Sequence, residues 1–93
     1  MLALEVHIRL AHSGSLKDKR QVVRSLLDGS RARFGVAAAE VGRLGSHRDA
    51  SLGFAAVSGS AGHAEEVISS VESFVWANPA IEVVSCERTW LEP

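Results

Sequence analysis

The chain has 93 residues, of which 46% are hydrophobic and 23% are charged. This length suits one domain over residues 1–93 and excludes a two-domain enzyme with an interdomain cleft. Ten basic and eleven acidic residues give a net charge of −1, which excludes a general attraction to nucleic acid or anionic lipid. Any such binding would need local separation of charge.

The cellular compartment is indicated by the cysteine count and the N-terminus. Cys86 is the only cysteine, and it therefore cannot form an internal disulfide. Residues 1–5 lack the basic segment of a signal peptide. No apolar run reaches the roughly 18 to 20 residues that a membrane helix needs. We expect a cytoplasmic protein with no membrane contact.

The first part of the chain predicts a strand followed by a helix. From Leu2 to Leu10 the apolar residues occupy every even position, which is typical of a strand with one buried face. Ser15 and Asp18 then fit an S-x-x-D capping box, which predicts a helix over about 16–33. Its predicted core face comprises Leu16, Val23, Leu26, Leu27, Ser30 and Phe34.

The rest of the chain predicts two strands, a second helix and a last strand. Strand character is expected over 36–43 and 51–58, with a polar loop at 42–49 between them. The in/out register of the first of these strands stays open. A helix with one apolar face is expected over 61–77, and 81–91 is a β-rich run.

This order of elements predicts an α+β fold of the ferredoxin-like βαββαβ type. The two crossover helices have the length that a split βαβ unit requires. Right-handed crossovers place both helices on one face of a four-stranded antiparallel sheet. The other face of the sheet is then left open.

Ser15-Leu16-Lys17-Asp18-Lys19-Arg20 resembles the S-L-K-x-K-R signature of the YlxP-like family of small bacterial proteins. Further similarity lies in Ala39-Glu40-Val41-Gly42, in the H-x-E-E pattern of His63, Glu65 and Glu66, and in the ending Glu87-Arg88-Thr89-Trp90-Leu91. The resemblance covers essentially the whole chain and implies a ferredoxin-like fold. It implies no defined activity, because the family is uncharacterised, and its genes often lie near genes for translation and ribosome maturation.

The predicted first helix carries a stripe of positive charge. At 100° per residue, four cations share an arc of about 60° beside the core face: Lys17, Arg20, Arg24 and Arg31. Segment 16–34 holds six basic and two acidic residues, whereas 60–78 holds three glutamates and no Lys or Arg. Two interpretations stay open: a solvated face that complements the acidic second helix, or a surface that contacts the phosphates of RNA.

Several polar segments are expected to meet near the N-terminus of this helix. In a ferredoxin-like fold the turn after the first strand and the hairpin between the next two strands lie at one edge. The residues expected there are His12, Ser13, Ser15, Lys17, Arg43, His47 and Arg48. Free N–H groups at a helix N-terminus favour anions. The candidate anion- or RNA-binding residues are therefore Ser15, Lys17, Arg20, Arg24, Arg31, Arg43 and Arg48, and the alternative is a capped turn beside a mobile basic hairpin.

Lys19 lies toward the apolar side of the same helix. A buried charge must be paired, so we predict a structural ion pair with Glu40 or Glu87. No residues combine into a nucleophile with its base or into paired carboxylates in a cleft. The four histidines and Cys86 lack metal-ligand spacing. We predict no enzymatic activity, no catalytic residues, no cofactor and no metal.

The first and last strands are expected to dominate the open sheet face. Odd positions of the first strand and even positions of the last would place Ala3, Glu5, His7 and Arg9 beside Val84, Cys86, Arg88 and Trp90. Such mixed apolar area favours self-association, whereas RNA-recognition sheets display aromatics that the first strand lacks. The candidate homodimer interface is therefore His7, Val84, Cys86, Arg88 and Trp90.

Two functions of different classes follow. The first is a small non-enzymatic protein that associates with RNA or a ribonucleoprotein through its first helix. The second is a homodimeric protein-interaction module that uses the open sheet face or an adjoining strand edge. The charge stripe favours the first, and the semi-apolar sheet favours the second.

Overall fold

The computed structural model describes residues 1–91, which form four strands and two helices. In chain order these are β1 (Leu2–Leu10), α1 (Leu16–Phe34), β2 (Ala37–Gly42), β3 (Asp49–Ala56), α2 (Ala61–Trp76) and β4 (Ile81–Trp90). Residues 92 and 93 of the predicted domain lie outside the described residues. The predicted order of elements is confirmed.

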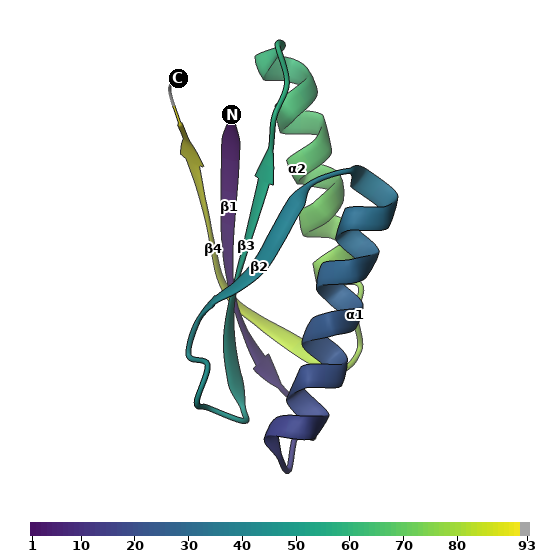
Figure 1. The fold of residues 1–93 in the computed structure, drawn as a ribbon, viewed down its shortest axis with the longest axis vertical. Helices are drawn as coiled ribbons and strands as arrows, with labels where there is room; N and C mark the ends of the chain where they lie inside the picture. Colours follow the sequence, from purple (N-terminus) through teal and green to yellow (C-terminus); the bar gives the residue numbers. More distant parts are fainter. Residues whose placement is uncertain (92–93) are drawn as a thin grey trace.

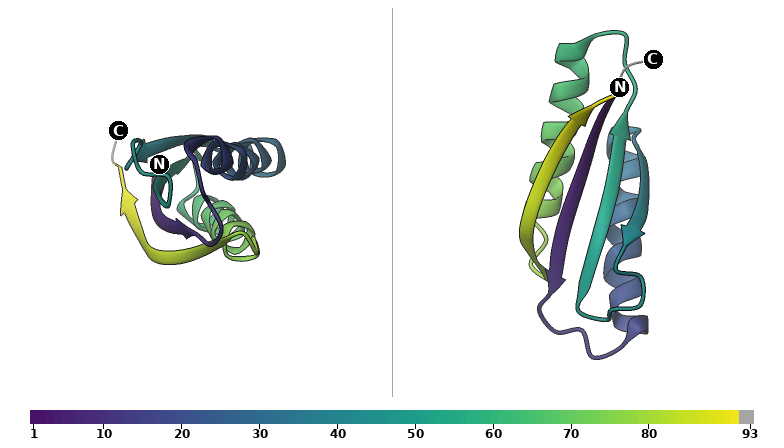
Figure 2. Two further views of the ribbon diagram at one scale, coloured as in Figure 1. Left: turned by 90° about the horizontal axis from the view of Figure 1, so that it is seen from below. Right: turned by 90° about the vertical axis from the view of Figure 1, so that its left-hand side faces the viewer.

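The strands form one antiparallel sheet in the order β2-β3-β1-β4. β1 and β3 are therefore central, and β2 and β4 are the two edges. Both helices cover the same face of the twisted sheet, and no helix of residues 1–91 covers the opposite face (Figure 1 and Figure 2). This is the ferredoxin-like α+β arrangement that the sequence predicts.

β1 provides the centre of the core. Its even side chains point toward the helices and are at most 3% exposed: Leu2, Leu4, Val6, Ile8 and Leu10. Phe54 of β3 and Ile68 of α2 belong to the same buried cluster. Because each large apolar side chain contributes roughly 1.5 to 3 kcal/mol when it is fully buried, this layer is the main source of stability.

The ends of α1 are set by the residues that flank it. Ser15 Oγ accepts a hydrogen bond from the Asp18 N–H at 3.2 Å, and Asp18 Oδ2 accepts one from the Gly14 N–H at 3.2 Å. At the other end Gly35 adopts φ 65°, and its N–H donates to the Arg31 carbonyl. A glycine in this left-handed conformation ends a helix without a steric penalty.

The core face of α1 is close to the predicted one. The buried members are Val23, Leu26, Leu27 and Ser30, and Phe34 is half-buried. Leu16, in the first turn, is instead 36% exposed. Gly29 lies against α2, where an added Cβ would stand 2.6 Å from Cζ of Phe74. The glycine inside the helix therefore permits the two helices to approach closely.

The register of β4 contradicts part of the predicted open face. Cys86 pairs with Val6, and directly opposed residues point to the same side of a sheet. Since Val6 is buried beneath the helices, Cys86 belongs to the helix side. The same alternation places Arg88 and Trp90 there. The prediction that these three side chains share the open face with His7 is wrong.

A β-bulge and the exposure of β4 explain this error. The β1–β4 register shifts between His7 and Ile8, so Val84 is an extra residue without a partner on β1. Every residue from Val84 to Trp90 is exposed, so this part of the strand has no alternation of buried and exposed positions that would reveal its inner face. The open face carries Ser85, Glu87 and Thr89 instead.

Candidate interaction surfaces

Three cations of α1 form an exposed patch, here named the basic surface: Lys17, Arg20 and Arg24. They line a shallow groove of ≈ 520 Å³ along the outer side of the helix. Within residues 1–91, none of the three forms an ion pair. At 1.5 Å per residue they extend over about 10 Å of the helix axis. The basic surface is therefore a short row of cations without ion-pair partners in this range, and the Asp28 carboxylate lines the same groove.

Arg31 belongs to the same predicted stripe, but its side chain forms contacts within the protein. Its Nη1 lies 2.9 Å from Oδ1 of Asp28, and its Nη2 donates to the carbonyl oxygen of Ala38 on the outer edge of β2. A phosphate at Arg31 would have to compete with both groups. The structure thus leaves three of the four predicted helix cations free for a ligand.

Lys19 holds the loop between β2 and β3 against α1. Its Nζ is surrounded by three oxygens, Glu40 Oε2 at 2.9 Å, the Arg43 carbonyl at 2.7 Å and the Ser46 carbonyl at 2.6 Å. The predicted ion pair therefore forms with Glu40 and not with Glu87. The Lys19 ammonium group therefore donates to two carbonyls of the loop and is paired with one carboxylate, as a buried charge requires.

Arg43 and Arg48 lie in this anchored loop, and both are exposed. The Arg43 carbonyl accepts from Lys19, and the Arg48 carbonyl accepts from the Leu10 N–H at 2.8 Å. The loop reaches the same end of the molecule as the start of α1 (Figure 1). The fold thus places both arginines at the same end of the molecule as the start of α1, with their backbones fixed and their side chains free of ion pairs within residues 1–91.

The N-terminus of α1 is already occupied by the protein's own groups. The Ser15 hydroxyl caps the helix, and the Asp18 carboxylate accepts from the Gly14 N–H. An incoming phosphate would meet this carboxylate at the positive end of the helix dipole. The side of α1 is therefore better suited to an anion than its N-terminus, and Ser15 acts as a cap.

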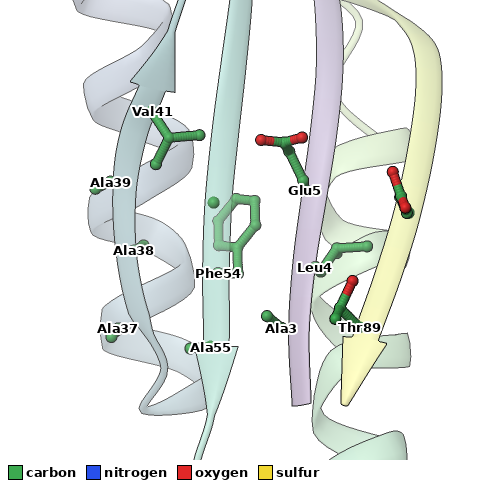
Figure 3. Close-up of a pocket in the computed structure, with 12 residues that line it drawn as sticks. Ala3, Leu4, Glu5, Ala37, Ala38, Ala39, Val41, Phe54, Ala55 and Thr89 are labelled. Atoms are coloured by element: carbon green, nitrogen blue, oxygen red, sulfur yellow. The ribbon is translucent and has the colours of Figure 1, made fainter. Parts of the chain in front are cut away.

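The open sheet face carries a shallow hollow of ≈ 600 Å³ that the sequence does not predict. Small residues of three strands form its floor: Ala37, Ala39, Gly53, Ala55 and Ala3 (Figure 3). Val41 leans over β3, so that a Cβ on Gly53 would stand 3.0 Å from its Cγ1. Only the strand register brings these small residues together, and the sequence does not determine that register at β2.

Two carboxylates border this hollow. Glu5 of β1 and Glu87 of β4 are direct cross-strand partners and both line it. Like charges directly opposite each other are unfavourable. A face-to-face homodimer over this hollow would bring four carboxylates together. The charge of the open face therefore disfavours it as a homodimer interface.

Cys86 and Arg88 face α2 on the other side of the sheet. Arg88 Nη2 donates to Ser69 Oγ at 3.2 Å and lies 3.5 Å from Oε2 of Glu72. Cys86 lies beside Glu72 and Trp76; partial burial raises the pKa of its thiol, and the Glu72 charge adds to this shift. Trp76 is 60% exposed. The sequence does not predict a role for Trp76, because its position on α2 predicts no contact with β4.

Neither a metal centre nor a membrane helix is found in the described part of the chain. No group of three or more His, Cys, Asp or Glu within residues 1–91 is placed to hold a metal ion. No helix in this range is long and apolar enough to cross a membrane.

Comparison with known proteins gives the family. The family model "Protein of unknown function (DUF503)" matches residues 1–88. The chain belongs to this family. The uncharacterized protein YlxP of Bacillus subtilis (strain 168) is 33% identical over 78 residues, which cover 84% of this chain and 85% of that protein. The predicted YlxP-like resemblance is confirmed, and neither description names an activity, a ligand or a partner.

The structure gives physical roles to the segment that carries the resemblance. Ser15 caps α1, and Lys19 anchors the β2–β3 loop through Glu40. Lys17 and Arg20 have no such structural contact within residues 1–91 and remain exposed. In this DUF503 member they are the two basic side chains of segment 15–20 that a ligand can reach.

Proposed function

We propose that this chain binds RNA through the basic surface of α1 and catalyses no reaction. One observation carries the proposal: Lys17, Arg20 and Arg24 are exposed side by side without an ion-pair partner in residues 1–91, whereas Arg31 and Arg88 are each paired with a carboxylate. Cations that have no structural partner are available to the phosphates of a nucleic acid.

The distribution of charge supports this proposal. Segment 16–34 holds six basic and two acidic residues, whereas α2 contains Glu65, Glu66 and Glu72 and no Lys or Arg. A chain with a net charge of −1 therefore still offers a positive face. RNA would approach α1 and be repelled from α2.

The composition of the basic surface favours recognition of the backbone over recognition of bases. Its lining residues, Lys17, Arg20, Gln21, Arg24, Ser25 and Asp28, include no aromatic side chain, and base stacking needs one. Phosphate contacts position a protein but carry no sequence information. Binding is thus expected to tolerate different RNA sequences.

Fluorescence anisotropy with a labelled single-stranded RNA tests the proposal. In Arg20→Ala/Arg24→Ala two phosphate contacts are lost, which should lower the affinity roughly 25-fold at about 0.1 M salt. The matched control is Arg9→Ala/Arg33→Ala, which removes the same charge elsewhere: Arg9 lies 3.4 Å from Asp49, and Arg33 stacks over Phe74 at 5.0 Å. This control should bind nearly as well as the wild type.

Two outcomes would contradict the proposal. Absence of binding at low salt would leave the basic surface as a solvated helix face. Equal losses in the two double variants would mean that RNA responds to net charge alone and not to the basic surface.

A further inference from the structure

The two edges of the sheet differ in how they are covered. At β2, Arg31 of α1 donates to the carbonyl oxygen of Ala38. At β4, no hydrogen bond from residues 1–91 reaches the outer backbone edge. β4 has ten residues, and an uncovered strand of this length is a template for pairing with another strand.

Contacts near the chain ends identify the groups of β4 that point outward. The Leu91 N–H donates to the Met1 carbonyl at 2.8 Å, and the Met1 amino group donates to the Leu91 carbonyl at 3.4 Å. In an antiparallel ladder such bonded pairs alternate with pairs whose N–H and C=O point away from the partner strand. Counting back from Leu91, the outward residues are Trp90, Arg88 and Cys86.

The bulge shifts this alternation by one residue. The register changes between His7 and Ile8, and beyond it the Ala11 N–H donates to the Ala80 carbonyl. On that side of the bulge the outward residues are therefore Val83 and Ile81. The outer edge of β4 thus presents the backbone groups of Ile81, Val83, Cys86, Arg88 and Trp90.

We infer that β4 pairs antiparallel with β4 of a second copy of this chain, about a two-fold axis at Cys86. The five outward residues are distributed symmetrically, two on each side of Cys86. The axis matches Cys86 with the partner's Cys86, Val83 with the partner's Arg88, and Ile81 with the partner's Trp90. Every outward group then finds a partner, and the two sheets become one continuous sheet.

Charge selects this axis over its neighbours. With the axis at Cys86, Glu82 opposes the partner's Thr89 and Glu87 opposes the partner's Ser85, so no like charges face each other. An axis at Glu87 would set this carboxylate against its own copy, and an axis at Arg88 would set two guanidinium groups together. Like charges directly opposite are destabilising.

The apolar side chains beside this edge fit the same pairing. Trp90 is 45% exposed and Trp76 is 60% exposed, and Cys86 lies beside Trp76. Pairing places Ile81 against the partner's Trp90, which is a contact between a β-branched and an aromatic side chain. Trp76 of α2 then lies over the junction of the two β4 strands. The dimer does not depend on RNA binding, because α1 flanks β2 at the opposite edge of the sheet.

The oligomeric state and one backbone hydrogen bond test the inference. Light scattering at micromolar concentration should give twice the chain mass of 9.9 kDa. Arg88→Pro removes an outward N–H and no bond to β1, so this variant should fold and be a monomer. Arg88→Ala loses the same side chain, keeps the N–H and should stay a dimer. A monomeric wild type, or a folded Arg88→Pro that remains a dimer, overturns the inference.

Oxidation of Cys86 tests the axis without altering the strand. A bonded pair has Cα atoms about 5.5 Å apart, within the roughly 4.4 to 6.8 Å that a disulfide bridges. Mild oxidation in alkaline buffer should therefore link two wild-type chains. The matched control, Cys86→Ser with Ser85→Cys, moves the thiol off the axis and should give little product. No wild-type product, or equal yields, overturns the axis even if Arg88→Pro fails to fold.

Discussion

Nζ of Lys19 lies 2.9 Å from Oε2 of Glu40, and the lysine side chain is 2% exposed. The pair joins the middle of β2 to the end of the first turn of α1, and the same ammonium group donates to two carbonyls of the following loop. Lys19, which is next to the exposed Arg20 in the sequence, thus has a structural role. Its surroundings explain why a lysine stands on the apolar side of a helix.

Removing this lysine should destabilise the protein strongly. Lys19→Met leaves Glu40 without its cation and two loop carbonyls without their donor, which should lower the free energy of unfolding by about 3 to 5 kcal/mol. Glu40→Gln keeps an acceptor and should cost less. Urea denaturation measures both losses. A change below about 0.5 kcal/mol in Lys19→Met would mean that the ion pair is solvated.

Removing the hydroxyl group of Ser30 should stabilise the protein. The side chain is fully buried between α1 and the sheet, and its Oγ has no hydrogen-bond partner among residues 1–91. Ser30→Ala removes this desolvated group and has the higher helix propensity, so stability should rise by about 1 kcal/mol. Thermal unfolding gives the comparison. A lower melting temperature in the variant would show that the hydroxyl is satisfied by a bound water.

Gly29→Ala should destabilise, although alanine favours helices by about 1 kcal/mol over glycine. The new Cβ would stand 2.6 Å from Cζ of Phe74, and overpacking of this kind costs about 1 to 3 kcal/mol. Combining the change with Phe74→Leu should recover part of the loss in a double-mutant cycle. If Gly29→Ala alone stabilises the protein, the two helices must be farther apart at Gly29 than the structure indicates.

The thiol of Cys86 should react slowly near neutral pH. Partial burial raises its pKa, and the Glu72 carboxylate raises it further, so the thiolate fraction is low until the pH exceeds this raised value. Glu72→Gln should speed alkylation at pH about 7. The measurement is a rate of modification against pH at low protein concentration. Unchanged rates in the variant would mean that Glu72 does not contribute to the raised pKa of Cys86.

Sequence predicts most of this fold because its signals are local. The even apolar positions of β1 specify one buried face, and Ser15 with Asp18 specifies where α1 begins. The apolar side of α1 even predicts that Lys19 needs a carboxylate. The identity of that carboxylate depends on the tertiary structure. Glu40 and Glu87 are on opposite edge strands, and only the order of strands in the sheet decides which of them lies beside Lys19.

The faces of the edge strands were beyond prediction for a physical reason. β4 is exposed on both sides over most of its length, so no burial pattern constrains its register. The bulge at Val84 also changes the parity of the strand. The sequence pattern therefore predicts the wrong face for Cys86, Arg88 and Trp90. The pairing of Arg31 with Asp28, which removes one cation from the predicted stripe, depends on side-chain conformations that helical spacing permits but does not require.

The salt dependence of RNA binding tests the proposed function most directly. Lys17, Arg20 and Arg24 form no ion pair within residues 1–91. If these three cations contact phosphates, a log–log plot of affinity against salt should have a slope near −2, since each phosphate contact on a single strand contributes about −0.7. Arg20→Ala/Arg24→Ala should reduce this slope to about −0.7. An unchanged slope in that variant, or no measurable binding of the wild type at low salt, would contradict RNA binding by α1.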